Sequence, residues 1–318
     1  MSSPAFASTA DLGEKTVSFE EIGKGVYAYT AEGDPNSGIV VGDDSVLVFD
    51  AQATPTMAER VIGKVREVTD KPVSHVVLSH YHAVRVLGAP AYGAKEIVSS
   101  DAARAMIVER GEEDKASEIG RFPRLFQGAD SIRPGLTWPT TTFSHNASIW
   151  LGKREVRLMK LGRGHTAGDI VAWMPDTNVI FAGDLVEYGA TPYCGDAHFT
   201  DWPTTLDALA AFAPAAMVPG RGAALTNRAM VADGIKGTRA FLTDLYEAVK
   251  SHVAAGRSLR ETFERVHETL KPSYGDWVIF EHCLPFNVTR AYDEAGGLDH
   301  PRIWTDERDR QMWLDLRG

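Results

Sequence analysis

Two histidines separated by one residue, His80 and His82, directly follow the apolar run Val76-Val77-Leu78. Such a run predicts a buried strand, and side chains at i and i+2 point the same way while strand geometry continues. Ligands often collect where strands open into loops. The pair alone fits either two hydrogen-bonded loop histidines or two ligands of one metal ion, because imidazole serves both purposes.

Two further residues extend this pair to a metal-ligand set. His165 lies in the glycine-rich turn 162–169, and Asp184 ends the segment Phe181-Ala182-Gly183-Asp184. Taken singly, each fits a turn residue that accepts from backbone amides. Three imidazoles and one carboxylate together suit Zn²⁺, with Fe or Mn as alternatives. We therefore expect one divalent metal, held by His80, His82, His165 and Asp184.

The order of the motifs resembles that of the metallo-β-lactamase-fold hydrolases. The matching pieces are H-x-H after a strand, then G-H-T-x-G-D, F-x-G-D and P-G-x-G, and they run from about Val17 to Ala224. The strand Val46 to Asp50 looks like the family's strand that ends in aspartate. The resemblance implies an α/β fold, a four-layer αββα sandwich, with the metal site at the edge between its two sheets.

The chain departs from the family's pattern at the second metal. The resemblance implies His80, His82 and His165 as ligands of a first metal and Asp184 as the bridging carboxylate, and all four are present. The positions peculiar to a second metal hold Val84, Arg85 and Arg221. None of these can ligate, because valine has no lone pair and a guanidinium does not release its proton. We therefore expect one metal per chain.

The two arginines would stand beside Asp184, where the second metal is lost. A guanidinium there can bind an anionic part of a substrate. It can equally do no more than neutralise the acid and stabilise the fold. The sequence leaves both roles open for Arg85 and Arg221.

A polar loop follows Asp184 and carries Tyr188, Tyr193, Asp196 and His198. We expect Tyr193 and His198 to join Arg85 and Arg221 in binding substrate, with a tyrosine donating to a developing oxyanion. The alternative is that such tyrosines are half-buried loop anchors. Arg290 and the pair His282-Cys283, in the C-terminal part, either reach the pocket or pack at a helix junction.

Strands and helices that would position these residues are predicted from periodicity and turn signals. The expected strands are 17–22, 26–30, 37–41, 45–49, 75–78, 97–99, 148–151, 155–161, 170–174, 179–182 and 216–218. Helices are expected from Thr54-Pro55 to about 68, over 102–109 and over 203–212, with loop or short helices over 111–139. Helices then dominate from about 230.

A C-terminal helical extension is predicted from residue 256. Ser258 to Glu261 has the capping-box pattern, and the apolar stripe Leu259, Phe263, Val266 and Leu270 follows. The expected organisation is a metallo-β-lactamase-like domain over 16–255 and a helical extension over 256–318 packed on it.

Composition excludes several classes of protein. The 318 residues carry a net charge of −10 and no basic run, which argues against nucleic acid or anionic membranes as partners. Two cysteines are too few for a disulfide framework or a Cys-based zinc finger. Residues 1–12 lack the features of a secretory signal, and no apolar stretch is long enough to cross a bilayer. We expect a cytoplasmic protein that acts on a small molecule, and a homo-oligomer is compatible with the sequence.

The leading hypothesis for function is a mononuclear zinc-dependent hydrolase. Its substrate would be a small, anionic ester, lactone or amide, attacked by a metal-activated water, with Asp184 as the base. The alternative is a non-catalytic protein that retains the metal and binds a small acidic ligand or a protein partner. The intact set of first-metal ligands favours the hydrolase.

Overall fold

A mixed sheet of seven strands forms one half of the molecule in the computed structural model, which describes residues 7–317. The strands lie in chain order, antiparallel from β1 to β4 and parallel from β4 to β7. Their bounds are Val17–Gly23 (β1), Val26–Ala31 (β2), Ser37–Val41 (β3), Val46–Phe49 (β4), Val73–Val77 (β5), Glu96–Ser100 (β6) and Thr141–Phe143 (β7).

A second sheet of five strands, in the order β12-β11-β10-β9-β8, packs against the first. The bounds are Asn146–Leu151 (β8), Arg154–Met159 (β9), Val171–Met174 (β10), Val179–Gly183 (β11) and Ala216–Pro219 (β12). Strands β11 and β12 are parallel, and the other neighbouring pairs are antiparallel. Apolar side chains of the two inner faces form one buried cluster, in which the rings of Phe49 and Phe181 lie 5.8 Å apart.

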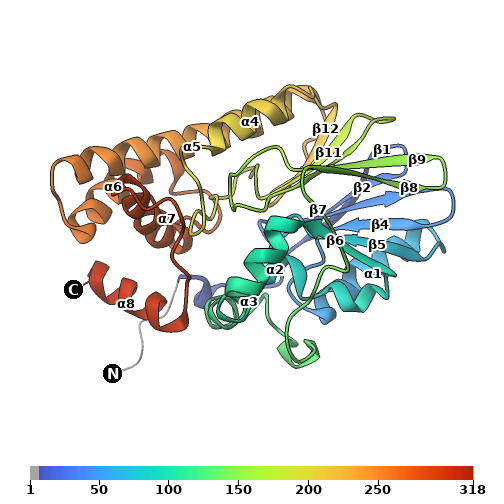
Figure 1. Cartoon of the computed structure of the whole chain (residues 1–318), viewed down its shortest axis with the longest axis horizontal. Coiled ribbons are helices and arrows are strands. Elements are labelled where there is room, and N and C mark those ends of the chain that lie inside the picture. Colours follow the sequence, from blue (N-terminus) through green and yellow to red (C-terminus); the bar gives the residue numbers. More distant parts are fainter. Residues whose placement is uncertain (1–6, 318) are drawn as a thin grey trace.

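Helices cover the outer faces of both sheets, as Figure 1 shows. Helix α1 shares a buried cluster with the first sheet, and α4 and α5 share one with the second. The bounds are Pro55–Val68 (α1), Ala83–Val86 (α2), Asp101–Arg121 (α3), Trp202–Ala210 (α4), Arg228–Ala254 (α5), Leu259–Tyr274 (α6), Phe280–Ala295 (α7) and Asp306–Arg317 (α8), with short 3-10 helices at Ala7–Ala10, Ala89–Tyr92 and Ala129–Ser131. The predicted αββα sandwich with C-terminal helices is confirmed.

Helix α1 begins as its sequence predicts. The Thr54 hydroxyl accepts a hydrogen bond from the amide of Met57 at 3.1 Å, and Pro55 lies in the first turn. The helix buries Val61 and Val65 against the first sheet. In the described residues, no helix is both long enough and apolar enough to cross a bilayer. The segment 1–12, for which no secretory signal is expected, begins outside the described residues.

The prediction for residues 102–139 is wrong in part, because α3 continues through Gly111 to Arg121. Its buried face is polar, with Arg110, Asp114, Ser117, Glu118 and Arg121 all at most 6% exposed. A buried face made of charged side chains gives no apolar periodicity, so the sequence pattern fades where the helix goes on. Strand β7, three residues long, was also not predicted.

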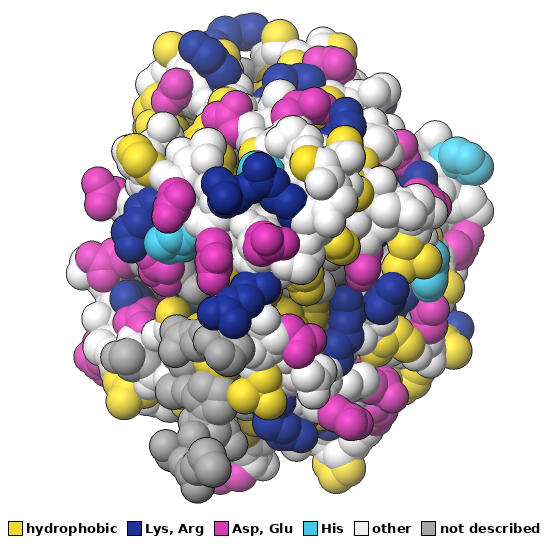
Figure 2. All heavy atoms as spheres, turned by 90° about the vertical axis from the view of Figure 1, so that its left-hand side faces the viewer, with side chains coloured by type: hydrophobic (Ala, Val, Ile, Leu, Met, Phe, Trp, Pro, Cys, Tyr) yellow, Lys and Arg dark blue, Asp and Glu magenta, His cyan; other side chains and the backbone are white. Residues whose placement is uncertain are grey.

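Helices α6 and α7 of the C-terminal extension pack against each other and against α5, the helix that covers the second sheet. Val266 and Leu270 of α6 are buried in a cluster that also holds residues of β11, α4, α5 and α7. Figure 2 shows acidic and basic side chains interspersed over this end of the molecule. The division into domains at residues 255 and 256 stays a prediction.

Several chain segments open into loops at one edge of the sandwich. Asp50 follows β4, His80 and His82 follow β5, Asp184 follows β11, and Arg221 follows β12. Because the carboxyl ends of neighbouring parallel strands meet at the same edge, these loops converge. That edge holds the candidate site.

Candidate metal centre

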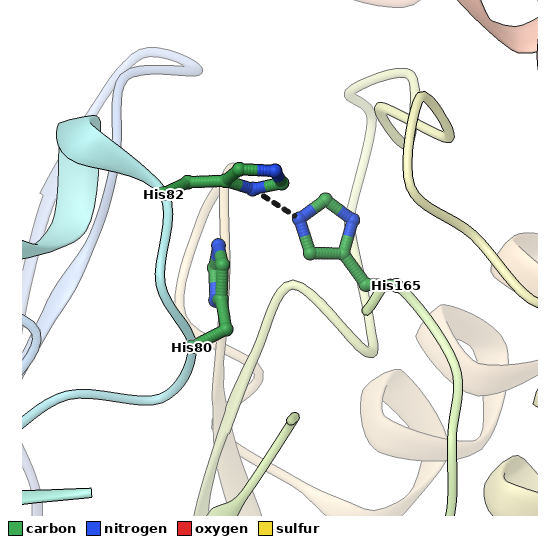
Figure 3. Close-up of side chains that lie close together, drawn as sticks. All are labelled: His80, His82 and His165. Atoms are coloured by element: carbon green, nitrogen blue, oxygen red, sulfur yellow. Dashed lines mark hydrogen bonds between the residues drawn. The ribbon is translucent and has the colours of Figure 1, made fainter. Parts of the chain in front are cut away.

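Three imidazoles meet at this edge of the sandwich. His80 and His82 lie between β5 and α2, and His165 lies between β9 and β10 (Figure 3). One ring nitrogen from each lies within 4.8 Å of those from the other two. All three side chains are exposed by 2% or less. The structure thus brings together the three histidines that the sequence nominates as ligands.

The ring nitrogen that each histidine turns away from the cluster has a partner. The partners are the Ser79 hydroxyl for Nδ1 of His80 at 2.8 Å, the Asp196 carboxylate for Nε2 of His82 at 3.1 Å, and the Tyr193 carbonyl for Nδ1 of His165 at 2.8 Å. A metal-ligating histidine typically holds its other nitrogen in this way, which fixes the ring and its tautomer.

The inner nitrogens fit a cation. Because a carboxylate and a carbonyl accept, the ring protons of His82 and His165 lie on their outer nitrogens. Their inner nitrogens, Nδ1 and Nε2, then face each other at 2.9 Å with lone pairs that repel unless a proton or a cation lies between them. Nε2 of His80 is buried and has no hydrogen-bond partner among the described residues. Three converging nitrogen donors suit Zn²⁺.

The pKa values of the three imidazoles differ because their surroundings differ. Burial lowers the pKa of His80 well below its ordinary value, and burial brings the pKa of His165 to about 3. Burial also disfavours charge on His82, but the carboxylates of Asp114 and Asp196 outweigh it and raise its pKa to about 9. His80 and His165 are therefore neutral near pH 7, as ligands must be, whereas a metal ion would have to displace a proton from His82.

Asp184 offers one carboxylate oxygen to the histidines. Its Oδ2 lies 3.6 Å from Nε2 of His165 and 3.9 Å from Nε2 of His80, while its Oδ1 pairs with Arg85. Burial alone would raise the pKa of this carboxyl, but the charge of Arg85 lowers it below its ordinary value. Asp184 is therefore an ionised acceptor beside the three imidazoles.

Arg85 fills the position beside Asp184 and is fully buried. Its Nη2 also donates to the carbonyl of Gly220 at 2.8 Å, and its Nη1 donates to the carbonyl of Asn36 at 3.0 Å. Asp50 lies 3.9 Å from Nη1, and burial raises the pKa of Asp50 to about 7. These protein contacts favour the neutralising role among the two that the sequence leaves open for Arg85.

Arg221 lies near the same carboxylate but bonds elsewhere. Its Nη1 donates to the carbonyl of Gly33 at 3.0 Å, and its charge contributes to the lowered pKa of Asp184. Glu187, which the sequence analysis missed, is 1% exposed nearby, and burial raises its pKa well above the ordinary value. Its place three residues after Asp184 is the signal that could have drawn attention to it.

Tyr193 and His198 occupy different places. The half-buried ring of Tyr193 lies 5.6 Å from the ring of His82 and 6.3 Å from that of His165. His198 is buried with its Nδ1 3.7 Å from Asp299, and burial lowers its pKa to about 4. The structure thus brings Tyr193 to the histidine cluster and sets His198 against the C-terminal extension.

Two acids of α3 support the loop of the histidine pair and were also missed. Asp114 accepts from the amide of Ala83 at 2.7 Å, and Glu118 accepts from that of Val84 at 2.9 Å. Their spacing of four residues puts them on one helix face, but they lie more than thirty positions from their partners. Nothing in the linear order joins them to the site.

Comparison with known proteins identifies the family. Residues 30–221 match the family model of the metallo-beta-lactamase superfamily. A metallo-beta-lactamase type 2 of Bacteroides fragilis is 25% identical over 219 residues, covering 65% of this chain and 79% of that protein. A linear primary-alkylsulfatase of a Pseudomonas species is 20% identical over 263 residues, covering 72% of this chain but only 49% of that longer protein.

Solved structures share the fold. A metallo-beta-lactamase from Pontibacter korlensis superposes with a TM-score of 0.56 at 18% identity, over 72% of this chain and 99% of that one. The metallo-beta-lactamase DIM-1 gives a TM-score of 0.55 at 15% identity, over 73% and 99%. With a family model that spans more than half of its length, this chain belongs to the metallo-beta-lactamase superfamily.

Proposed function

We propose that this chain is a hydrolase with one zinc ion per chain, acting on a small anionic ester, lactone or amide. The observation that carries the proposal is the imidazole cluster, in which the outer nitrogens are partnered and the inner nitrogens converge. Zinc, when bound, lowers the pKa of a coordinated water towards neutrality and so supplies the nucleophile. Iron or manganese is the alternative metal.

Asp184 acts as the base in this proposal. Arg85 holds one carboxylate oxygen, which turns the other, Oδ2, towards the histidines. The lowered pKa of Asp184 keeps it ionised and able to accept a proton from the attacking water. Arg85 therefore works through Asp184, as a positioning residue.

Substrate contacts are assigned to Arg221 and to the loop after β11. Arg221 places a fixed positive charge near Asp184, which attracts an anionic group of the substrate. The ring of Tyr193 lies against two of the imidazoles, so its hydroxyl is our candidate donor to a developing oxyanion. His198, on the same loop, is a weaker candidate because its ring faces Asp299.

Burial of the cluster favours a second candidate function, a non-catalytic protein that retains the metal and binds a small acidic ligand or a protein partner. All three histidine side chains are almost without solvent contact, which suits metal retention as well as catalysis. A measurement of substrate turnover distinguishes the two functions, because only the hydrolase turns over a substrate.

Two buried free cysteines, Cys194 and Cys283, support a reducing compartment, the cytoplasm, as the location. The net charge of −10 supports a small-molecule substrate rather than nucleic acid. A homo-oligomer stays a prediction.

His165→Ala tests the metal. We expect the purified wild type to hold one zinc per chain and the variant to lose it, because two imidazoles and one carboxylate hold the ion too weakly. The matched control is His145→Ala, since His145 is exposed, lies between β7 and β8 and is not a member of the cluster. Elemental analysis of the three proteins gives the stoichiometry, and two tightly held metals in the wild type would refute the mononuclear site.

Arg221→Ala tests the hydrolase. We expect this variant to keep its metal and to lose catalytic efficiency towards anionic esters, lactones and amides more than towards neutral ones. A panel of matched anionic and neutral substrates, read as kcat/KM, measures the difference. A wild type that holds one tight metal but hydrolyses nothing in the panel supports the binding-protein alternative instead.

A further inference from the structure

One loop provides the hydrogen-bond partners for the outer ring nitrogens of two of the three histidines. Residues 190–200, here called the site loop, connect β11 towards α4 and provide the Tyr193 carbonyl for His165 and the Asp196 carboxylate for His82. His80 differs, because its outer partner is the adjacent Ser79. The orientation of His82 and His165 therefore depends on where the site loop lies.

The site loop is in turn fastened by the C-terminal extension. Asn287, Arg290 and Glu294 share one face of α7, at spacings of three and four residues. The bonds are Asn287 Nδ2 to the Pro192 carbonyl at 2.8 Å, the Cys194 amide to Asn287 Oδ1 at 2.7 Å, Arg290 Nε to the Ala197 carbonyl at 2.7 Å, and the amides of Phe199 and Thr200 to the Glu294 carboxylate at 3.1 and 3.0 Å. The fastened positions flank Tyr193 and Asp196.

The segment between α7 and α8 adds two further supports. The indole Nε1 of Trp304 donates to the carbonyl of Gly195, next to Asp196, at 2.9 Å. Arg110 of α3 donates to Oδ1 of Asp196 at 2.7 Å, and the Pro301 carbonyl accepts from the same guanidinium at 3.1 Å. Asp196 is thereby held through its own carboxylate and through its neighbours.

We propose that the C-terminal extension is a positioning element of the metal centre, acting through the site loop on His82 and His165. The inference rests on the proposed metal-binding function and adds a role to residues that lie beyond the matched family region, which ends at 221. Outer partners of ligating histidines typically change metal affinity by about 10- to 100-fold when removed. A merely structural extension would change folding stability and leave metal affinity as it was.

Trp304→Phe tests the proposal in the full-length protein, because it removes one N–H donor and keeps an aromatic ring. Its matched control is Tyr292→Phe, which removes one side-chain donor of α7 whose hydrogen bond goes to the carbonyl of Arg257 and not to the site loop. Zinc affinity is measured by competition with a chelator of known affinity. We expect about threefold to tenfold weaker binding for Trp304→Phe and an unchanged affinity for Tyr292→Phe.

Two further variants, with larger expected losses of zinc affinity, allow the effect of Trp304→Phe to be ranked. Asn287→Ala removes both bonds to the site loop, and Asp196→Ala removes the partner of His82 itself. We expect the loss of zinc affinity to grow in the order Trp304→Phe, Asn287→Ala, Asp196→Ala, reaching about 100-fold. Folded Trp304→Phe and Asn287→Ala proteins that bind zinc like the wild type would overturn the proposal.

A metal-free readout separates this inference from the proposed function. Long-range proton–nitrogen NMR correlations report which ring nitrogen of His165 carries the proton. We expect the Nδ1–H form in the wild type and a mixture of tautomers in Asn287→Ala. A wild type that binds no metal but shows this change would refute the metal function and retain the positioning role. An unchanged tautomer together with unchanged affinity would refute the positioning role.

Discussion

Arg85 is a permanent positive charge enclosed by protein. It pairs with Asp184, lies 3.9 Å from Asp50 and donates to two backbone carbonyls, with no solvent exposure. Removing one partner of a buried ion pair leaves the other charge without compensation, which costs far more than the pair gains by existing. The stability of this edge of the sandwich therefore depends on Arg85.

Replacing this arginine tests that dependence. We expect Arg85→Met to lower the free energy of unfolding by about 3–5 kcal/mol, because Asp184 and Asp50 lose their nearest cation. Urea unfolding in the presence of a chelator measures the loss without the metal's contribution. Arg66→Met, at an exposed arginine of α1, is the control and should change stability by less than about 0.5 kcal/mol. A loss below about 1 kcal/mol for Arg85→Met would contradict the expectation.

His282 makes stability depend on pH. Burial, with the charges of Arg121 and Arg221, lowers the pKa of His282 well below 6.5 in the folded chain. The unfolded chain binds a proton near pH 6.5 that the folded chain does not accept, so this residue destabilises the fold progressively as pH falls below 6.5 and has no effect above it. At pH 5.5 the loss from this group is about 1.4 kcal/mol.

His282→Leu removes this contribution. We expect the fall in the free energy of unfolding between pH 8 and pH 5.5 to be smaller by about 1.4 kcal/mol in the variant than in the wild type. Urea unfolding at both pH values, with metal chelated, measures the difference. The exposed His145→Leu should keep the wild-type pH dependence. An equal pH dependence in His282→Leu would show that another group carries it.

Individual site residues can be predicted from the sequence where they lie in short contiguous motifs. His80, His82, His165 and Asp184 are recognisable because each sits in a short pattern at a strand end. Asp196 can be nominated only as a loop residue, since its pairing with His82 spans 114 positions. Such long-range pairings depend on how elements pack, and no local pattern records them.

Helices differ in how well their sequences reveal them. Helix α1 has a cap, a proline in the first turn and an apolar stripe, and it was predicted to within a residue. Helix α3 buries acids and arginines, so the sequence of its second half is polar and predicts a loop. Periodicity detects a helix that buries apolar side chains and misses one that buries charge.

Helix α6 begins with the predicted capping box. The Ser258 hydroxyl accepts from the amide of Glu261, and the Glu261 carboxylate accepts from the amide of Ser258 at 2.9 Å. We expect Ser258→Ala to lower the free energy of unfolding by about 1 kcal/mol. Because the two bonds are reciprocal, Glu261→Ala should add little to Ser258→Ala in a double-mutant cycle.

Denaturant unfolding of the two single variants and the double variant provides the cycle. Ser251→Ala is the control, since its exposed hydroxyl bonds back to the carbonyl of Ala248 within α5. If the losses in free energy of unfolding of the two single variants add fully in the double variant, the two hydrogen bonds of the capping box act independently.

One buried cluster joins the second sheet to the helices of the C-terminal half. It joins Ile180 of β11, Leu206 of α4, Phe241 of α5, Leu270 of α6 and Leu284 of α7. Since the extension and the second sheet bury the same apolar surface, neither can unfold without exposing the other. The sequence stripe indicates that α6 has a buried face, but it does not indicate which partner covers it.

We therefore expect the metal-free chain to unfold in one cooperative transition. Scanning calorimetry should give a single peak with equal calorimetric and van't Hoff enthalpies. Leu270→Ala should lower the free energy of unfolding by about 2–5 kcal/mol. The single peak should then move to a lower temperature without splitting. An earlier, separate transition of the extension would instead support two independent folding units at the predicted boundary.

The enclosed Arg85–Asp184 pair also limits which substitutions this edge of the sandwich tolerates. Histidine at position 85 alone would leave Asp184 and Asp50 without their cation, and it would find no ligating partner at Val84 or Arg221. A change of Arg85 to a metal-ligating residue by itself therefore gives a variant that is less stable and that gains no complete second site. Because natural proteins tolerate little loss of stability, selection removes such intermediates before the next step arises. Arg85 is therefore difficult to replace by one substitution at a time.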